Sequence, residues 1–149
     1  MTLNQIVKQL TTMGNAHEQI NFVYFGDVWE RLSNGEVTYP AMFFNLTGAN
    51  ILSKEIQFNF SLYFIDRMLS EETNETEVLS DMTSVAQDIV AQLRYPQDYD
   101  NVTWTLGNNM SLTYYTESDP DYLAGVKTDI ILAIPFINDR CQVPSNYTF

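Results

Sequence analysis

The sequence predicts an α+β domain, a two-layer sandwich in which two helices pack on one face of a mainly antiparallel sheet of four to five strands. Two long segments, 55–68 and 122–136, alternate apolar and polar residues, which is the pattern of half-buried strands. Two other segments, 3–13 and 78–93, place apolar residues at every third or fourth position, as amphipathic helices do. The order is one helix, three strands, a second helix and then two or three strands, which favours antiparallel pairing with both helices on the same face.

The two alternating segments are longer than the domain that should contain them. At about 3.3 Å per residue, the segment 55–68 spans roughly 45 Å. A compact domain of 149 residues has a diameter of only about 38 Å. We therefore expect two central strands whose ends extend beyond the core.

The first helix begins with a capping-box pattern, because Thr2 is followed three residues later by Gln5. Gly14 weakens its end, so the helix stops there or continues to about Gln19. The apolar, aromatic run 20–25 then favours a strand.

The next elements are shorter. Residues 28–32 form a short helix or a loop, and Ser33-Asn34-Gly35 is a turn signal. A strand over 37–46 follows, and Pro40 indicates that it begins or borders the sheet, since proline cannot donate to a ladder. Residues 47–50 should turn the chain into the segment 55–68.

The second helix should begin after an acidic connection, 70–76, where Asn74 and Glu77 offer a capping-box-like start. Alternation in 102–106 and 110–116 indicates two short strands or one interrupted strand. We expect one domain over 1–138 and an extended tail over 139–149.

Composition excludes several functional classes. Nineteen acidic residues against seven basic ones give a formal charge of −12, which argues against a phosphate-binding surface. The single cysteine, Cys141, excludes an intrachain disulfide and favours a reducing compartment. No apolar run approaches the ~20 residues of a membrane span, and the first residues lack the apolar core of a signal peptide. The chain is expected to be soluble and unsecreted.

Candidate chemistry is sparse, and we expect no catalytic, metal or cofactor site. His17, the only histidine, fits a solvated helix end better than a catalytic group. Asp119-Pro120-Asp121 lacks the glycine and glutamate that a calcium loop requires. An acidic run at the start of the second helix is a candidate cation or partner surface, although such runs are usually only solvated. Its members are Glu71, Glu72, Glu75, Glu77 and Asp81.

Six glycosylation sequons open a second interpretation, that of a secreted or surface acidic binding domain, with a small enzyme third. They begin at Asn45, Asn59, Asn74, Asn101, Asn109 and Asn146. One of them falls on the polar face of a predicted strand, and no leader would deliver the chain to a glycosylating compartment. The sequons are therefore better explained as a feature of polar strand faces.

Apolar residues on the sheet face away from the two helices indicate contacts with another chain. They are Tyr63, Ile65, Ile131 and Ile137. A face meant to stay in water would not carry this much apolar surface, so we expect these four side chains to form a subunit interface.

The chain resembles phage tail-terminator and neck proteins, in particular the small ring proteins of the head-to-tail connector in crAss-like phages. The resemblance covers roughly 3–138. It rests on four features: the amphipathic first helix, the run 22–27 followed by Thr38-Tyr39-Pro40, the strand 58–65 leading into the helix 78–93, and the closing strand 126–136. It implies a homo-oligomeric ring in the virion, assembled in the host cytoplasm and stacked with other neck, tail or portal-proximal proteins. The genome would pass through the channel without specific binding, and no catalytic residues carry over.

Overall fold

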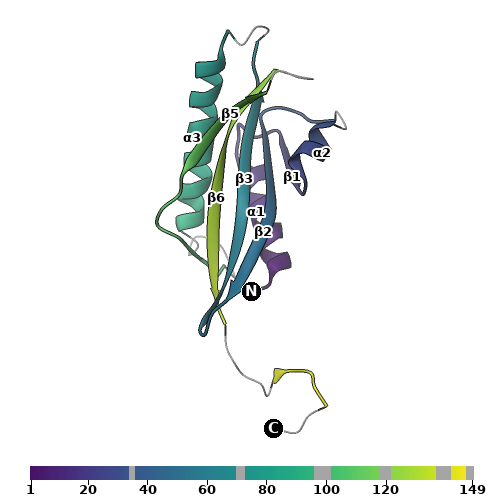
Figure 1. Cartoon of the computed structure of the whole chain (residues 1–149), viewed down its shortest axis with the longest axis vertical. Coiled ribbons are helices and arrows are strands. Elements are labelled where there is room, and N and C mark those ends of the chain that lie inside the picture. Colours follow the sequence, from purple (N-terminus) through teal and green to yellow (C-terminus); the bar gives the residue numbers. More distant parts are fainter. Residues whose placement is uncertain (34–35, 70–72, 96–101, 118–121, 137–141, 147–149) are drawn as a thin grey trace.

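The computed structural model describes residues 1–33, 36–69, 73–95, 102–117, 122–136 and 142–146 (Figure 1). The helices are α1 (Leu3–Ala16), α2 (Val28–Ser33) and α3 (Glu75–Arg94). The strands are β1 (Phe22–Phe25), β2 (Ala41–Ile51), β3 (Glu55–Arg67), β4 (Thr105–Leu106), β5 (Leu112–Glu117) and β6 (Leu123–Pro135).

All six strands belong to one sheet, in which β1, β2, β3, β6 and β4 lie side by side in that order and β5 also pairs with β6. Every pairing is antiparallel except that of β1 with β2, which is parallel. The predicted α+β class and the mainly antiparallel sheet are confirmed. The sheet has six strands rather than four to five, and the segments 102–106 and 110–116 contribute two separate strands, β4 and β5.

The two predicted helices, α1 and α3, pack on the same face of the sheet, as expected. Ile6 and Leu10 of α1 and Ile89 and Leu93 of α3 are fully buried in one core with the apolar residues of β3. This core contains Phe58, Phe60, Leu62 and Phe64, the even-numbered side of β3. The alternation read from the sequence therefore identified the correct buried face of the central strand.

A third helix covers part of the opposite face, for which the sequence predicted no covering helix. Val28 and Leu32 of α2 pack with Phe43, Ile65 and Leu123 in a second, smaller core. The short helix follows β1, and β1 places Phe22 and Tyr24 against this second core. The upper half of the sheet is thus covered on both faces.

The start of each long helix is only partly as predicted. Thr2 and Gln5 form a complete capping box at α1, and the helix ends at Ala16. At α3, Asn74 makes no capping hydrogen bond and instead accepts one from the backbone N–H of Leu69 at 2.6 Å. Asn74 is therefore the N-cap residue of α3, as predicted, but its side chain binds the preceding loop instead of completing a capping box.

One of the two alternatives for Pro40 is confirmed, because β2 begins at Ala41, directly after Pro40. The start of the strand is not a sheet border, since β1 pairs with residues 41–44. Residues 47–50 are not a turn, since β2 runs through them to Ile51, with a shift of register between Leu46 and Gly48. The hairpin turn lies at Leu52, whose N–H donates to the carbonyl oxygen of Glu55 at 2.8 Å.

The two short strands expected after α3 are β4 and β5, and both pair with the outer side of β6. Trp104, which is 1 % exposed, donates its indole N–H to the carbonyl oxygen of Leu93 at 3.0 Å and so fastens this segment to the end of α3. In the predicted tail, residues 142–146 are exposed and belong to no strand of the sheet. Cys141 and the segment Asp119-Pro120-Asp121 lie outside the described residues.

Candidate assembly interface

The tip of the β2–β3 hairpin extends past both long helices (Figure 1). Leu132 and Ile134, at the lower end of β6, are still buried in the main core. We call the lower end of the sheet the arm and define it as residues 47–57 and 131–136. Glu55 pairs with Pro135 and Ile51 pairs with Ile56, so all three central strands remain paired to their ends. The predicted overreach of the central strands is thus present, and it ends in a β2–β3 hairpin.

The arm exposes apolar side chains on both of its faces. Ile51 is 70 % exposed, Ile131 44 %, Leu52 43 % and Phe136 37 %. Ile51 pairs with Ile56 and so lies on the helix side, whereas Ile131 pairs with Asn59 and lies on the other side. Exposed apolar residues gathered at one projecting end are typical of a surface that contacts another protein.

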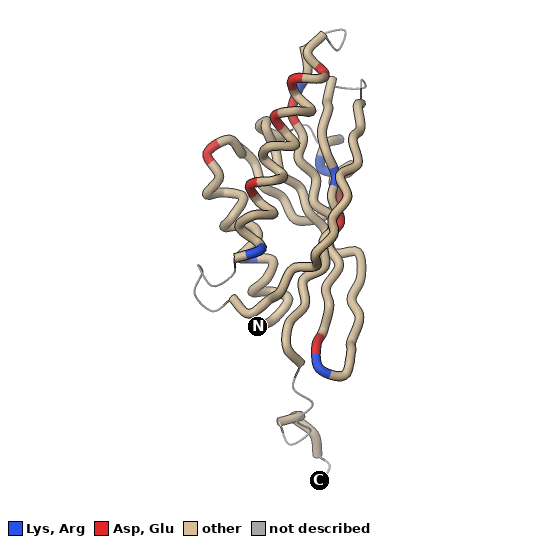
Figure 2. Tube along the Cα trace, turned by 90° about the vertical axis from the view of Figure 1, so that its left-hand side faces the viewer, with Lys and Arg blue, Asp and Glu red and all other residues tan. Residues whose placement is uncertain are grey.

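The arm has no net charge, although the chain carries −12. Its only charged residues are Lys54 and Glu55, neighbours of opposite sign at the hairpin turn. Figure 2 shows this pair at the tip of the hairpin and several acidic residues along α3. Because copies with the same large charge repel one another, a neutral arm is where contact between copies is least opposed.

The structure separates the four residues predicted as an interface. Ile65 is fully buried in the second core, so the expectation that it contacts another subunit is wrong in this fold. Tyr63 is half-buried against the same core, with its ring centroid 6.4 Å from that of Tyr115. Ile131 is exposed on the arm, and Ile137 lies outside the described residues. Only Ile131 therefore supports the predicted interface.

Three exposed apolar residues of the arm were not among the predicted interface residues: Ile51, Leu52 and Phe136. The apolar pair 51–52 stands directly before Ser53-Lys54, a polar turn that would have indicated a hairpin tip. The predicted turn at 47–50 was incompatible with a hairpin tip at 53–54, so these residues were not predicted to be exposed at the tip.

The described members of the acidic run, Glu75, Glu77 and Asp81, belong to no group placed to hold a metal ion. Glu71 and Glu72 lie outside the described residues, Glu75 accepts a hydrogen bond from the hydroxyl of Thr116 at 2.8 Å, and Glu77 is exposed. Asp81 lines a hollow of about 330 Å³ together with Asp66 and Glu18. Within the described ranges, no three His, Cys, Asp or Glu side chains are placed to hold a metal ion.

The carboxyl group of Asp66, which lines this hollow, has a raised pKa. Burial raises the pKa of its carboxyl group, the backbone N–H of Arg67 lowers it, and the carboxylate of Asp81 raises it again. The region thus disfavours additional negative charge.

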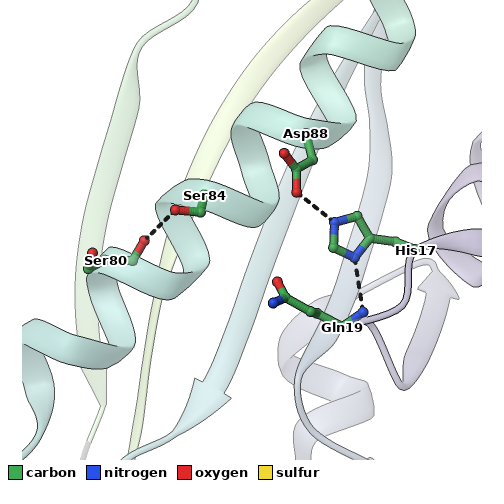
Figure 3. Close-up of polar contacts among 5 residues, drawn as sticks. All are labelled: His17, Gln19, Ser80, Ser84 and Asp88. Carbon is green, nitrogen blue, oxygen red and sulfur yellow. Dashed lines mark hydrogen bonds and ion pairs between the residues drawn. The ribbon is translucent and has the colours of Figure 1, made fainter.

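His17 is not a solvated helix end, which corrects the prediction (Figure 3). It caps α1, its side chain is only 10 % exposed, and its Nε2 lies 2.9 Å from Oδ2 of Asp88 on α3. The backbone N–H of Gln19 donates to Nδ1 at 3.1 Å, which leaves Nε2 as the nitrogen that donates to Asp88. Nε2 therefore joins α1 to α3, while Nδ1 holds the ring against the backbone that follows α1.

Among the helices in the described ranges, none is long and apolar enough to cross a membrane. Comparison with known families and with curated proteins gave no match to this sequence.

Proposed function

We propose that the chain is a structural, non-catalytic subunit of a homo-oligomeric ring in a phage neck or tail junction, either a connector or a tail terminator. The ring would belong to the virion and would surround the channel through which the genome leaves. The observation that supports this proposal best is the arm, a paired three-stranded extension with apolar side chains on both faces and no net charge.

The arm fits a ring because a projecting element that contacts a different surface on the next copy gives a heterologous contact. Contacts of this kind close into rings when the rotation between copies divides a full turn. The resemblance to neck and tail-terminator proteins provides the rest of the proposal.

The alternative of a glycosylated surface domain is less well supported. Asn45 and Asn59 are half-buried in β2 and β3, and the oxygen atom of each side-chain amide is buried. A bulky glycan on either residue would have to displace neighbouring strands of the sheet. Two of the six sequons are thus poor acceptors.

The proposal is tested by measuring the mass of the purified chain in solution and imaging it by negative stain. We expect closed rings with a mass several times that of the 17.2 kDa chain. Ile131→Asp should shift the mass toward the monomer, because it places a charge on the apolar arm. Asn15→Asp, at an exposed position of α1, is the matched control and should leave the mass unchanged. A mass of one chain at every concentration, with no rings in the images, would contradict the proposed function.

A further inference from the structure

A groove of about 450 Å³ lies between the C-terminal half of α3 and the segment that leads into β5. Its apolar walls are formed by Ala86 and Val90 on α3 and by Met110 and Leu112 on the opposite side. This volume is within the range of sites that bury a small ligand or a few side chains.

Two polar groups distinguish the groove from a simple gap in packing. Arg94 lines it and is held in place by a hydrogen bond from its Nη2 to the carbonyl oxygen of Asn108, at 3.1 Å. Thr128 also lines it, and its residue is 1 % exposed with a hydroxyl that has no partner among the described residues. An apolar site that holds a cation at one end suits an apolar group beside a carboxylate.

The tip of the arm has this chemistry. Ile51 and Leu52 are both exposed, and Glu55 closes the same turn. Leu52 precedes Glu55 across the turn, and the carboxylate of Glu55 accepts a hydrogen bond from Nε2 of Gln57 at 3.1 Å. The tip is also held in one shape, since Leu52 donates to Glu55 and the backbone N–H of Phe136 donates to the carbonyl oxygen of Lys54, both at 2.8 Å. A tip that is already ordered loses little conformational entropy when it binds.

We propose that residues 51–55 of one copy dock in the α3–β5 groove of the next copy, with Ile51 and Leu52 between the apolar walls and Glu55 beside Arg94. This inference rests on the proposed function and names the site on the neighbour that receives the arm. A second copy is favoured over other occupants by charge. The α3 helix carries four acidic residues and one basic residue, Arg94, and the tip presents Lys54 toward this acidic surface while Glu55 meets its one cation.

The contact is tested by disulfide formation between copies that each contain one cysteine. In a Cys141→Ser background, a Leu52→Cys chain is mixed with a Gln87→Cys chain, since Gln87 is exposed and lines the groove. Any bond between the two is intermolecular because neither chain has a second cysteine. We expect a cross-linked dimer from this pair and none when Asn15→Cys on α1 replaces Gln87→Cys as the matched control.

The charge contact is tested by reversal. Glu55→Arg alone and Arg94→Glu alone should each reduce the cross-linked fraction several-fold, and the two changes together should restore it. A small cross-linked fraction equal to that of the control, measured on samples that still form rings, would overturn the groove as the docking site and leave the ring proposal standing. Absence of both rings and cross-links would overturn both proposals. Equal losses in the single and the combined reversals would overturn the Glu55–Arg94 contact.

Discussion

Gly125 lies at a position of the sheet where neighbouring atoms leave no room for a side chain. Gly125 of β6 pairs with Ile65 on one side and Tyr115 on the other. A Cβ at this position would collide with the carbonyl oxygen of Phe64 and lie 3.0 Å from the hydroxyl of Tyr115. The absence of a side chain lets the ring of Tyr115 lie across the sheet, where burial raises the pKa of its phenol well above the usual value.

Gly125→Ala should therefore destabilise the fold by about 1–3 kcal/mol, the usual cost of overpacking a filled core. The change in the free energy of unfolding is read from denaturant titration. Gly107→Ala is the control, because a Cβ there would meet nothing within 4 Å, and its effect should be small. Equal effects at the two glycines would mean that the contact at Gly125 relaxes freely.

The raised pKa of Asp66 predicts a pH dependence of stability. In the unfolded chain this carboxyl group titrates near 3.8, and in the folded chain it titrates higher because burial disfavours the charged form. Between the two values the folded chain retains a proton that the unfolded chain has lost, so the free energy of unfolding falls as pH rises through this window.

Asp66→Asn should remove this part of the slope, because an amide does not titrate. The measurement is the denaturant midpoint from pH 3.8 upward, for wild type and variant. Parallel curves for the two proteins would show that Asp66 does not contribute.

At the scale of elements, α3 is the helix on which the main core depends. Ile89 is fully buried against the sheet, whereas Gln87, two residues earlier, is exposed. The same helix also receives the bond from His17 and forms one wall of the α3–β5 groove. Its inner face thus stabilises the fold, and its outer face is available for contacts.

Ile89→Ala should cost on the order of 2–5 kcal/mol of unfolding free energy, because it leaves a cavity in a packed core. Gln87→Ala should change little, since its side chain is not part of that core. Thermal or denaturant unfolding of the two variants provides the comparison. Similar small effects at both positions would mean that α3 is not packed on the sheet as described.

At the scale of the whole molecule, the basic residues give little support for binding nucleic acid. Three of the seven stand over aromatic rings: the guanidinium of Arg31 lies 5.3 Å from the ring centroid of Phe22, that of Arg67 lies 5.0 Å from that of Tyr39, and the amine of Lys127 lies 5.7 Å from that of Tyr63. These cations are engaged in the folded chain, and the net charge of −12 repels phosphate.

The protein should therefore show no affinity for duplex DNA at physiological salt, even if its ring surrounds a genome. A channel of the same sign as DNA would let the duplex slide without sticking. Fluorescence anisotropy with a labelled duplex measures this directly. A micromolar dissociation constant that weakens as salt is added would show that a basic surface exists after all.

The sequence by itself determined the two long helices, the two central strands and the buried side of those strands. The apolar stripes of α1 and α3 and the alternation in β3 and β6 arise from the local geometry of helix and strand, so they can be read without knowing the neighbours. The length of the alternating segments also showed that the sheet would outreach its core. These features gave the α+β class and the expectation of an arm.

Only the tertiary structure decided what covers each face. Ile65 and Ile131 share one side of the sheet, and the pattern of the sequence treats them alike. Ile65 is buried because β1 pairs parallel to β2 and is followed by α2, which covers the upper half of that side. Ile131 stays exposed because, in the part of the chain that the structure describes, no helix lies over the lower half of the same side. Periodicity shows which side chains share a face of the sheet. Which element covers that face depends on where a distant segment of the chain packs. The hydrophobic effect is non-directional, so a local sequence pattern cannot identify that segment.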